Sequence, residues 1–326
     1  MSISCRLNYY RRIFAAYLTA ENSQLTFWHE VPEVNERALP GEIGEYYMLF
    51  RSKSGYAGPY DRAGVPLLNY HGALGLQYNP IAVAQYGLAN YNLYKRTGAS
   101  DRLERCVNAA DWLVQNLEKN HRGLWVWHHH FNWEYRTVLR APWYSALAQG
   151  QGISFLVRLS RELGEPRYVE TAARAFEAFH KTVQEGGMVY VDDAGRIWLE
   201  EYIVSPPTHI LNGFIWALWG VYDFFLAAAN PAARDLFAEG IRTLMANLHR
   251  YDTGSWSLYD LPGTRIQNRA SPYYHHLHIV QLMILSRLTG QDAFRAFADR
   301  WQAYQTIGTN RLRALAWKSA FKLLYY

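Results

Sequence analysis

Apolar residues recur at helical spacing through most of the chain, in segments that come in pairs and are bounded by Pro, Gly or Asn. Four pairs begin near residues 80, 142, 207 and 271, so successive starts are 62, 65 and 64 residues apart. The predicted helices cover 80–98 with 101–120, 142–164 with 166–184, 207–229 with 231–249, and 272–290 with 292–305. Such a regular repeat predicts an array of helical hairpins, which either stacks in a line or closes into a ring.

The first segment of each pair favours a ring. Residues 210–229, for example, are almost continuously apolar, as expected for an inner helix that its neighbours cover on nearly all sides. The small number of hairpins also favours a ring over a linear stack. We therefore predict a mainly α fold, an (α/α) toroid of four helical hairpins with short β-hairpins at the rim.

Two connections between the pairs have the pattern of extended chain. Residues 123–135 are rich in Trp and His, and residues 187–202 alternate apolar and polar positions on both sides of an Asp192-Asp-Ala-Gly turn. The second pattern predicts a β-hairpin. Both connections would lie at one rim of the toroid, where loops on a rigid scaffold carry function. The expected organisation is 1–70 as an N-terminal helical arm with short strands, 71–310 as the toroid that carries the chemistry, and 311–326 as a C-terminal tail.

Composition adds a preference for sugar. Of the 326 residues, 50% are hydrophobic and 16% are aromatic, including 25 Tyr and 12 Trp. Tyr and Trp combine an apolar face with a polar tip, which suits a groove that stacks on sugar rings. An ordinary aromatic-rich helical core would have the same composition, so both interpretations stay open at this point.

The charges are spread along the chain. The 33 Lys and Arg residues give a net charge of only +5 and form no long basic run, so we expect no nucleic acid partner, whereas an anionic polysaccharide would be attracted. Cys5 and Cys106 are the two cysteines. They provide no disulfide framework and fit a reducing compartment, so a cytoplasmic location is expected.

Both ends of the chain contain basic and apolar residues. Arg6, Arg11 and Arg12 precede a brief apolar run at 13–20, which we interpret as an amphipathic helix and not as a signal peptide. Residues 318–326 combine two Lys with aromatic and aliphatic residues. This pattern is compatible with peripheral membrane contact, but a packed terminal helix is favoured over it.

The candidate chemistry lies in tyrosines that neighbour acids. The strings Glu200-Glu201-Tyr202, Tyr259-Asp260 and Ser271-Pro-Tyr-Tyr274 stand in connections or at predicted helix starts. A tyrosine that acts as a base needs a neighbouring cation, which Arg265 and Arg269 could supply. Each tyrosine alone is more readily explained as a buried aromatic with its hydroxyl satisfied. The His128-His-His and His275-His-Leu-His runs have no carboxylate at fixed ligand spacing, so we predict no metal site.

A series of short strings resembles the catalytic C-terminal region of the D-glucuronyl C5-epimerases, which convert glucuronic to iduronic acid within heparan sulfate precursors. The strings occur in family order from about residue 60 to residue 305. They are Gly64-Val-Pro-Leu, Tyr78-Asn-Pro-Ile-Ala-Val-Ala-Gln-Tyr-Gly-Leu, Ser145-Ala-Leu-Ala-Gln-Gly-Gln-Gly-Ile-Ser, Glu200-Glu-Tyr, Leu211-Asn-Gly-Phe, Gly220-Val-Tyr-Asp, Tyr251-Asp-Thr-Gly-Ser, Leu258-Tyr-Asp-Leu, Tyr274-His-His-Leu-His and Arg300-Trp.

The resemblance implies an α/α toroid of four helix pairs and an isomerase that acts on a glucuronate-containing, heparosan-like polysaccharide without a cofactor. It implies a homodimer as well. By motif it carries over the catalytic residues Tyr202, Tyr259, Tyr274 and Glu201, and the substrate-binding residues Tyr78, Asn79, Gln85, Gln149, Asn212 and His275. Arg265 or Arg269, between Tyr259 and Tyr274, is expected to bind the uronate carboxylate. In animal members a basic residue follows the Tyr-Asp-Leu string, whereas this chain has Pro262 there, and Arg265 is the expected substitute.

Two alternatives follow from the same features. A uronate polysaccharide lyase begins with the same proton abstraction at C5 and then eliminates the 4-linked sugar. A toroid that binds glycan without catalysis would also use an aromatic groove. The resemblance favours the epimerase over both.

Overall fold

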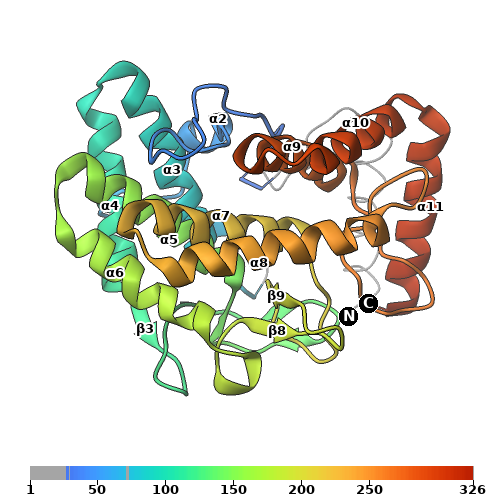
Figure 1. Ribbon diagram of the computed structural model, residues 1–326. Helices are drawn as coiled ribbons and strands as arrows, with labels where there is room; N and C mark the ends of the chain where they lie inside the picture. Colours follow the sequence, from blue (N-terminus) through green and yellow to red (C-terminus); the bar gives the residue numbers. More distant parts are fainter. Residues whose placement is uncertain (1–26, 29, 71–72, 326) are drawn as a thin grey trace.

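The four predicted helix pairs are present in the computed structural model, which describes residues 27–28, 30–70 and 73–325 (Figure 1). The pairs are α3 Pro80–Thr97 with α4 Ser100–Gln115, α5 Ala146–Leu163 with α6 Pro166–Phe176, α7 Leu211–Ala228 with α8 Pro231–Asn247, and α9 Pro272–Thr289 with α10 Asp292–Thr306. Two helices start later than predicted, α5 at Ala146 and α7 at Leu211, because the residues before them are extended. Ser145, for example, has β geometry and caps α5 by accepting a hydrogen bond from the Leu147 amide.

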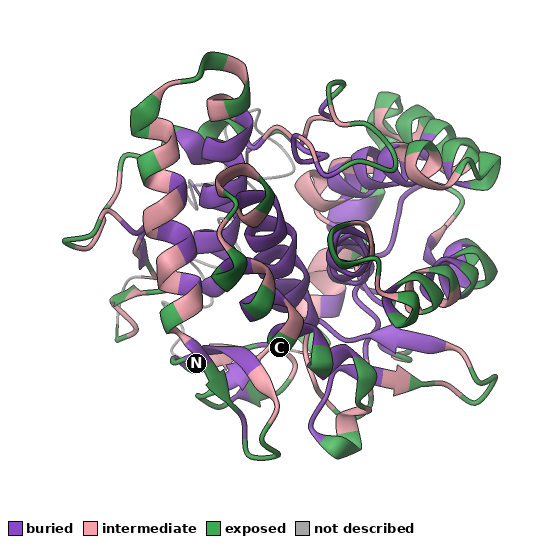
Figure 2. Cartoon of the chain, turned by 60° about the vertical axis from the view of Figure 1, so that its left-hand side comes forward, coloured by how far each residue is buried: buried purple, intermediate pink, exposed green. Residues whose placement is uncertain are grey.

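The first helix of each pair lies inside and the second outside, which confirms the predicted α/α toroid. Inner helices α3, α5, α7 and α9 contact one another in chain order, and each outer helix packs on its partner. Figure 2 shows a central group of almost wholly buried helices, flanked by helices that expose an outer face. Helix α7 is long and apolar enough to span a membrane, with a mean hydropathy of 1.3, but 78% of it is buried inside the protein. It is the central core helix of this fold.

Glycines bring α5 and α7 into backbone contact. A Cβ atom on Gly150 would lie 2.6 Å from Cα of Ala217, and one on Gly220 would lie 2.2 Å from the carbonyl oxygen of Gly150. The two helices run parallel, since Arg158 and Asp223 pair about two turns further along α5 and about one to two turns further along α7. The absence of side chains at these glycines therefore sets the distance between the two inner helices.

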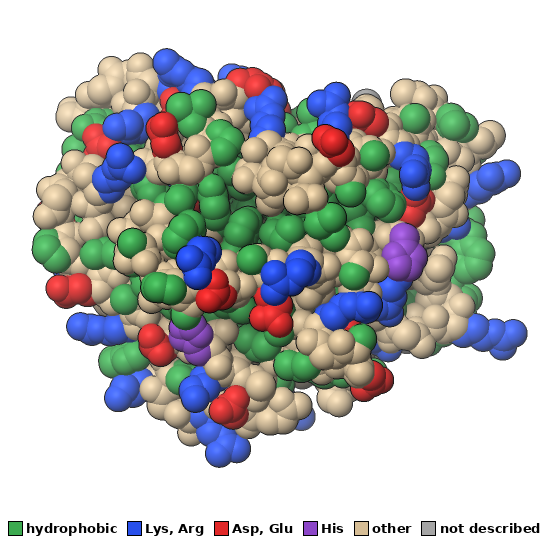
Figure 3. Space-filling view, viewed as in Figure 1, with side chains coloured by type: hydrophobic (Ala, Val, Ile, Leu, Met, Phe, Trp, Pro, Cys, Tyr) green, Lys and Arg blue, Asp and Glu red, His purple; other side chains and the backbone are tan. Residues whose placement is uncertain are grey.

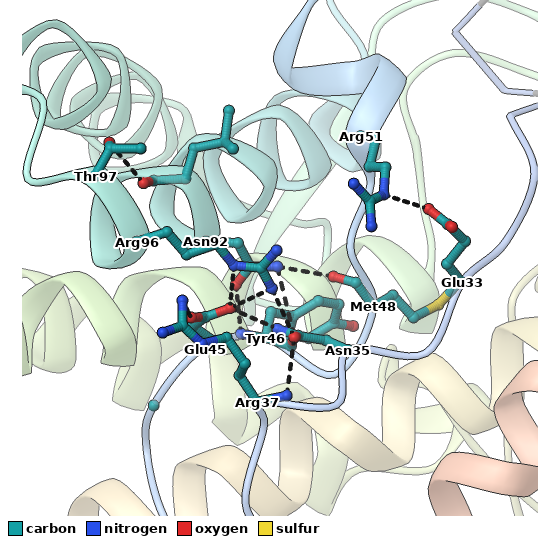
Figure 4. Close-up of polar contacts among 12 residues, drawn as sticks. Glu33, Asn35, Arg37, Glu45, Tyr46, Met48, Arg51, Asn92, Arg96 and Thr97 are labelled. Atoms are coloured by element: carbon teal, nitrogen blue, oxygen red, sulfur yellow. Dashed lines mark hydrogen bonds and ion pairs between the residues drawn. The ribbon is translucent and has the colours of Figure 1, made fainter.

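Residues 30–60 run across the C-terminal ends of the inner helices. Figure 4 shows one anchor, in which Arg96 of α3 pairs with Glu45 at 2.6 Å and Asn92 accepts a hydrogen bond from the Tyr46 amide at 2.6 Å. A second anchor is the fully buried Arg158–Asp223 pair, at 2.6 Å. Arg158 also donates to the carbonyl of Gly44 at 3.0 Å. This segment, which includes the short helix α2 Arg51–Ser54, closes the end of the toroid where the inner helices finish.

The strands lie in the connections that lead into the inner helices. The predicted hairpin is confirmed: β8 Val189–Val191 pairs with β9 Ile197–Leu199 in antiparallel register, with Tyr190 opposite Trp198. The remaining strands are β1 Leu68–Asn69, β2 Leu76–Gln77, β3 Leu117–Lys119, β4 Trp125–His129, β5 Trp133–Glu134, β6 Val138–Leu139 and β7 Trp143–Tyr144, with short 3₁₀ helices η1 Glu177–His180, η2 Val183–Glu185 and η3 Leu248–Tyr251. Since the connections precede α3, α5 and α7, they gather at the rim where inner helices begin.

A last helix, α11 Gly308–Tyr325, stands at one end of the molecule beside the loop that follows α8 (Figure 1). Its Ala314 and Leu315 are buried against Trp256 and Ala270 of that loop. The predicted packed terminal helix is therefore confirmed. On the face in Figure 3, Lys and Arg side chains are dispersed among Asp and Glu. The predicted helix at 13–20 and Cys5 lie outside the described residues, and the predicted homodimer and cytoplasmic location stay predictions.

Candidate active site

The β8–β9 hairpin delivers two adjacent glutamates to the rim. Glu200 is fixed in the protein: its carboxylate accepts hydrogen bonds from Nδ1 of His209 at 2.5 Å and from the His209 amide at 3.2 Å. The ring of His209 stacks on Trp198 at 4.2 Å. Successive side chains in extended chain point to opposite sides. The anchoring of Glu200 therefore directs Glu201 toward the start of α7.

Glu201 occupies a pocket at the first turn of α7. It is only 4% exposed, and Nδ2 of Asn212 lies 3.5 Å from its Oε2 atom. Burial raises the pKa of Glu201 to about 8; the Asp260 and Glu200 carboxylates add to the rise, and a hydrogen bond from Tyr202 opposes it. Glu201 thus changes its protonation state near neutral pH, where a general acid or base is most effective.

Tyr202 lies at the edge of this pocket and is half-buried. Its ring packs against Tyr135 at 4.6 Å and against Trp143 at 5.7 Å. The Tyr135 hydroxyl donates to Oδ2 of the fully buried Asp260 at 2.7 Å. The connection before α5 and the loop after α8 therefore meet at Tyr202.

Tyr259 and Tyr274 come from the loop after α8 and from the first turn of α9. The carbonyl of Tyr259 accepts the first amide of α7, from Leu211, at 3.1 Å. Ser271 caps α9 by accepting a hydrogen bond from the Tyr274 amide at 3.3 Å. These backbone anchors bring the two rings together, with centroids 4.8 Å apart at 67°. The three predicted tyrosines and Glu201 therefore come from separate elements into one cluster.

Tyr259 and Tyr274 are protonated at neutral pH. Burial raises the pKa of Tyr259 well above its usual value, and the charge of Glu201 adds to the rise. Burial and Glu201 act in the same direction on the pKa of Tyr274, against a hydrogen bond with Tyr259. These two hydroxyls are therefore hydrogen-bond and proton donors in the resting protein, whereas Glu201, with a pKa of about 8, is the group that ionises most readily and can then accept a proton.

The two predicted arginines do not face this cluster. Arg265 is exposed. Arg269 is buried elsewhere: its Nη1 atom donates to Oγ of Ser255 at 3.1 Å, and its guanidinium lies 5.4 Å from the ring of Trp317. The cation beside Tyr259 is instead Lys318 of α11, with Nζ 5.4 Å from the ring centroid. Sequence reasoning missed this residue.

Asn212 is the predicted binding residue that touches the cluster, through Glu201. Tyr78 and Asn79 stand at the start of α3, where Tyr78 stacks on Trp112 at 5.2 Å and Asn79 caps the helix. Tyr78 is 37% exposed and available to a ligand, whereas Asn79 is buried and donates to the hydroxyl of Tyr70 at 2.8 Å.

The other three predicted binding residues have structural contacts. Gln85 donates to Gln151 of the neighbouring inner helix at 3.0 Å. Gln149 donates to the carbonyls of Trp125 and Ala175, each at 2.8 Å. His275 is fully buried, stacked on Trp256 at 3.8 Å, and its Nε2 atom lies 3.1 Å from the carbonyl of Trp301. These contacts hold the inner helices and the rim connections together.

No group of three or more His, Cys, Asp or Glu side chains within residues 30–70 and 73–325 could hold a metal ion. In the His128-His-His run, His129 stacks face to face on Trp143 at 3.8 Å, while His128 and His130 both lie close to Glu118. Successive positions of a strand face opposite sides, so the three rings do not converge.

Comparison with known proteins gives a family. Residues 119–303 match the family described as D-glucuronyl C5-epimerase C-terminus. A D-glucuronyl C5-epimerase of Caenorhabditis elegans is 35% identical over 212 residues, 60% of this chain and 34% of the relative. An uncharacterized protein of Methanocaldococcus jannaschii is 28% identical over 202 residues, 61% of this chain and 64% of the relative. The chain thus spans about a third and about two thirds of the length of these relatives.

Among solved structures, cellobiose 2-epimerase from Spirochaeta thermophila superposes with a TM-score of 0.48 at 13% identity, covering 68% of this chain and 57% of that protein. The family match covers more than half of the chain and includes Glu201, Tyr202, Tyr259 and Tyr274, the side chains that meet at the rim. The chain belongs to the D-glucuronyl C5-epimerase family, in the part that forms the C-terminal region of its members.

Proposed function

We propose that this protein epimerises D-glucuronyl residues to L-iduronyl residues at C5 within a heparosan-like polysaccharide. The proposal is supported by the family and by one observation above all: a carboxyl group whose pKa is about 8 lies among three tyrosines at the open rim of the toroid. Such a set of groups suits a reaction that removes a proton from carbon and returns one.

In the proposed reaction the C5–H bond breaks first. The electron pair moves into the bond between C5 and the carboxylate carbon, which gives a doubly charged aci-carboxylate. A proton then returns to C5 from the opposite face of the ring, and the charge on the carboxylate falls back to one. Because the hydrogen moves as a proton in both steps, no electron acceptor is required.

Glu201, hydrogen-bonded to Tyr202, is the proposed acid/base group on one face of the sugar. Tyr274 is the proposed group on the other face, since its high pKa keeps a transferable proton on the hydroxyl. Tyr259 would donate a hydrogen bond to the substrate carboxylate. In the reverse direction Tyr274 would accept the proton, and protonated Glu201 would deliver one.

Glu200 has no part in the proposed chemistry. Its carboxylate is paired with His209, through the ring Nδ1 atom and the backbone amide. The two adjacent carboxyl groups thus differ in their partners: Glu200 faces an imidazole, whereas Glu201 faces the neutral side chains of Tyr202 and Asn212.

The test is two-dimensional NMR of N-sulfated heparosan after incubation with the protein. Iduronyl signals should appear while the chain length of the polymer is unchanged. Unsaturated uronyl ends without iduronate would favour the lyase alternative, and unchanged signals despite binding would favour the non-catalytic glycan-binding alternative.

A further inference from the structure

Lys318 approaches the tyrosine cluster from α11. Its Nζ atom donates to Oδ1 of Asn268 at 2.7 Å and lies 5.4 Å from the ring centroid of Tyr259. The helix is held there by Ala314 and Leu315, which are buried in a small apolar cluster that Tyr259 and Tyr274 also contact. The same helix face that packs on the loop therefore presents the Lys318 ammonium to the site.

Asn268 connects Lys318 with the acidic side of the cluster. The backbone carbonyl of Asn268 accepts a hydrogen bond from the Tyr259 amide at 2.8 Å, which fixes the two residues relative to each other. Burial raises the pKa of the nearby Asp260 carboxyl group, and Tyr135, Lys318 and the Asn268 side chain oppose the rise. The ammonium is thus positioned within the protein before any substrate arrives.

The ammonium is also poorly solvated. Burial lowers the pKa of Lys318 to about 8, against the attraction of Asp260. Lys318 is therefore mostly charged at pH 7, but it has already lost part of its water. An anion that binds beside the ammonium is attracted by its charge, and no further water has to be removed from Lys318. This condition favours strong stabilisation of developing negative charge.

Other cations near the loop after α8 are less suited to bind a substrate carboxylate. Arg269 is engaged with Ser255 and Trp317. Burial and the charge of Lys318 lower the pKa of Lys322 well below its usual range, against the attraction of Asp260. Arg265 is exposed.

On the basis of the proposed function, we propose that Lys318 binds the uronate carboxylate and stabilises its second negative charge as the C5 proton leaves. Lys318 keeps its own protons throughout; it supplies charge and up to three hydrogen-bond donors. The residue lies beyond residue 303, where the family match ends, so α11 of this chain completes the site. Asn268 is a positioning residue for Lys318.

The test compares Lys318→Met, Lys318→Arg and Arg313→Ala. Arg313 is an exposed cation of the same helix and serves as the matched control. The measurement is kcat/KM for hydrogen exchange at C5 of N-sulfated heparosan, from pH 6 to pH 10. Lys318→Met should lose about 100-fold or more in kcat/KM, with most of the loss in kcat, because the interaction strengthens in the transition state. Arg313→Ala should match the wild type.

The pH profile separates binding of the carboxylate from a structural role. In the wild type, kcat/KM should rise toward pH 8 as Glu201 ionises and fall above about pH 8 as Lys318 loses its proton. Lys318→Arg should keep measurable activity and move this fall to higher pH, since a guanidinium does not deprotonate there. The Arg variant retains the charge and most of the side-chain volume, so it decides the question even if Lys318→Met does not fold.

Two negative outcomes are distinct. If the wild type exchanges C5 hydrogen and the Lys318 variants behave like Arg313→Ala, with the same alkaline limb, the assignment of Lys318 is overturned and the proposed function stands. If the wild type exchanges no C5 hydrogen at any pH, the proposed function fails and the role of Lys318 fails with it.

Discussion

The carboxyl group of Glu201 occupies the space that a side chain on Gly213 would need. A Cβ atom on Gly213 would lie 2.2 Å from Oε2 of Glu201 and 2.7 Å from its Cβ atom. The string Leu211-Asn-Gly-Phe thus does two things at the first turn of α7: Asn212 approaches the carboxyl group, and Gly213 leaves room for it.

The first prediction concerns this glycine. Gly213→Ala should displace Glu201 and lower kcat/KM by about 100-fold, because misplacing a reacting group by about 1 Å has an effect of that size. Gly308→Ala is the control, since nothing lies within 4 Å of a Cβ atom there. Full activity of a folded Gly213→Ala protein would show that the observed position of Glu201 is not needed for the reaction.

The second prediction concerns the stability and the activity of Glu201→Gln. The pKa of Glu201 is raised in the folded protein. The contribution of its protonated carboxyl group to the free energy of unfolding is therefore present at pH 4 and is lost as pH rises toward about 8. The variant should gain stability over the wild type, by a difference that grows across this range to a few kcal/mol, since one pKa unit is about 1.4 kcal/mol. Activity should fall about 10²–10⁴-fold.

Urea unfolding of both proteins at pH 5 and pH 9 measures that difference. A stability difference that is the same at the two pH values would mean that Glu201 titrates in the folded protein as it does in water.

A third prediction separates the tyrosine hydroxyls from their rings. Tyr274→Phe keeps the packing with Tyr259 and removes only the hydroxyl, so the melting temperature should change little while epimerisation falls about 10²–10⁴-fold. Tyr202→Phe should behave similarly. Tyr94→Phe, on the last turns of α3 at the opposite end of the toroid, is the matched control. Wild-type rates in either cluster variant would remove that tyrosine from the proton-transfer chemistry.

A fourth prediction tests the closed end of the toroid. Asp223→Ala leaves the fully buried Arg158 without its partner and removes the acceptor of the Tyr47 hydroxyl. The free energy of unfolding should fall by about 3–5 kcal/mol. Asp235→Ala breaks an exposed pair with Arg234 instead and should change it by less than about 1 kcal/mol. Equal effects in chemical denaturation would contradict the account of how residues 30–60 are anchored.

The helices could be predicted from sequence because the relevant signal is local. Apolar spacing, proline at a first turn and glycine after a last turn recur in each pair, as at Pro166 and Gly164. The errors occur where a local signal misleads. Pro142 and Pro207 resemble helix starts, but the helices begin only after Ser145 and Ile210, which both have extended backbone geometry.

The placement of the candidate site residues depends in part on tertiary structure. Arg269 was chosen because it lies between Tyr259 and Tyr274 in sequence. In the structure its guanidinium lies over Trp317 of α11 and donates to Ser255, whereas the neighbouring Asn268 side chain accepts a hydrogen bond from Lys318 of the same helix. Lys318 could not be predicted, because no local pattern states that α11 folds back against the rim.

Tyr135 and Asp260 could be predicted only in part from the sequence. Asp260 stands inside the Tyr-Asp-Leu string, next to a tyrosine that was chosen. Its buried position, and the hydrogen bond from Tyr135 more than a hundred residues away, follow only from the way the rim connections meet.

Hydrogen exchange at C5 in heavy water tests the central claim most directly. N-sulfated heparosan would be incubated with the protein in D₂O, with Glu201→Gln as the parallel control, and C5 would be examined by NMR. The account predicts deuterium at C5 of both glucuronyl and iduronyl residues with the wild type, in an uncleaved polymer, and little or none with the variant. Protium retained at every C5 position after incubation with the folded wild-type protein would contradict it.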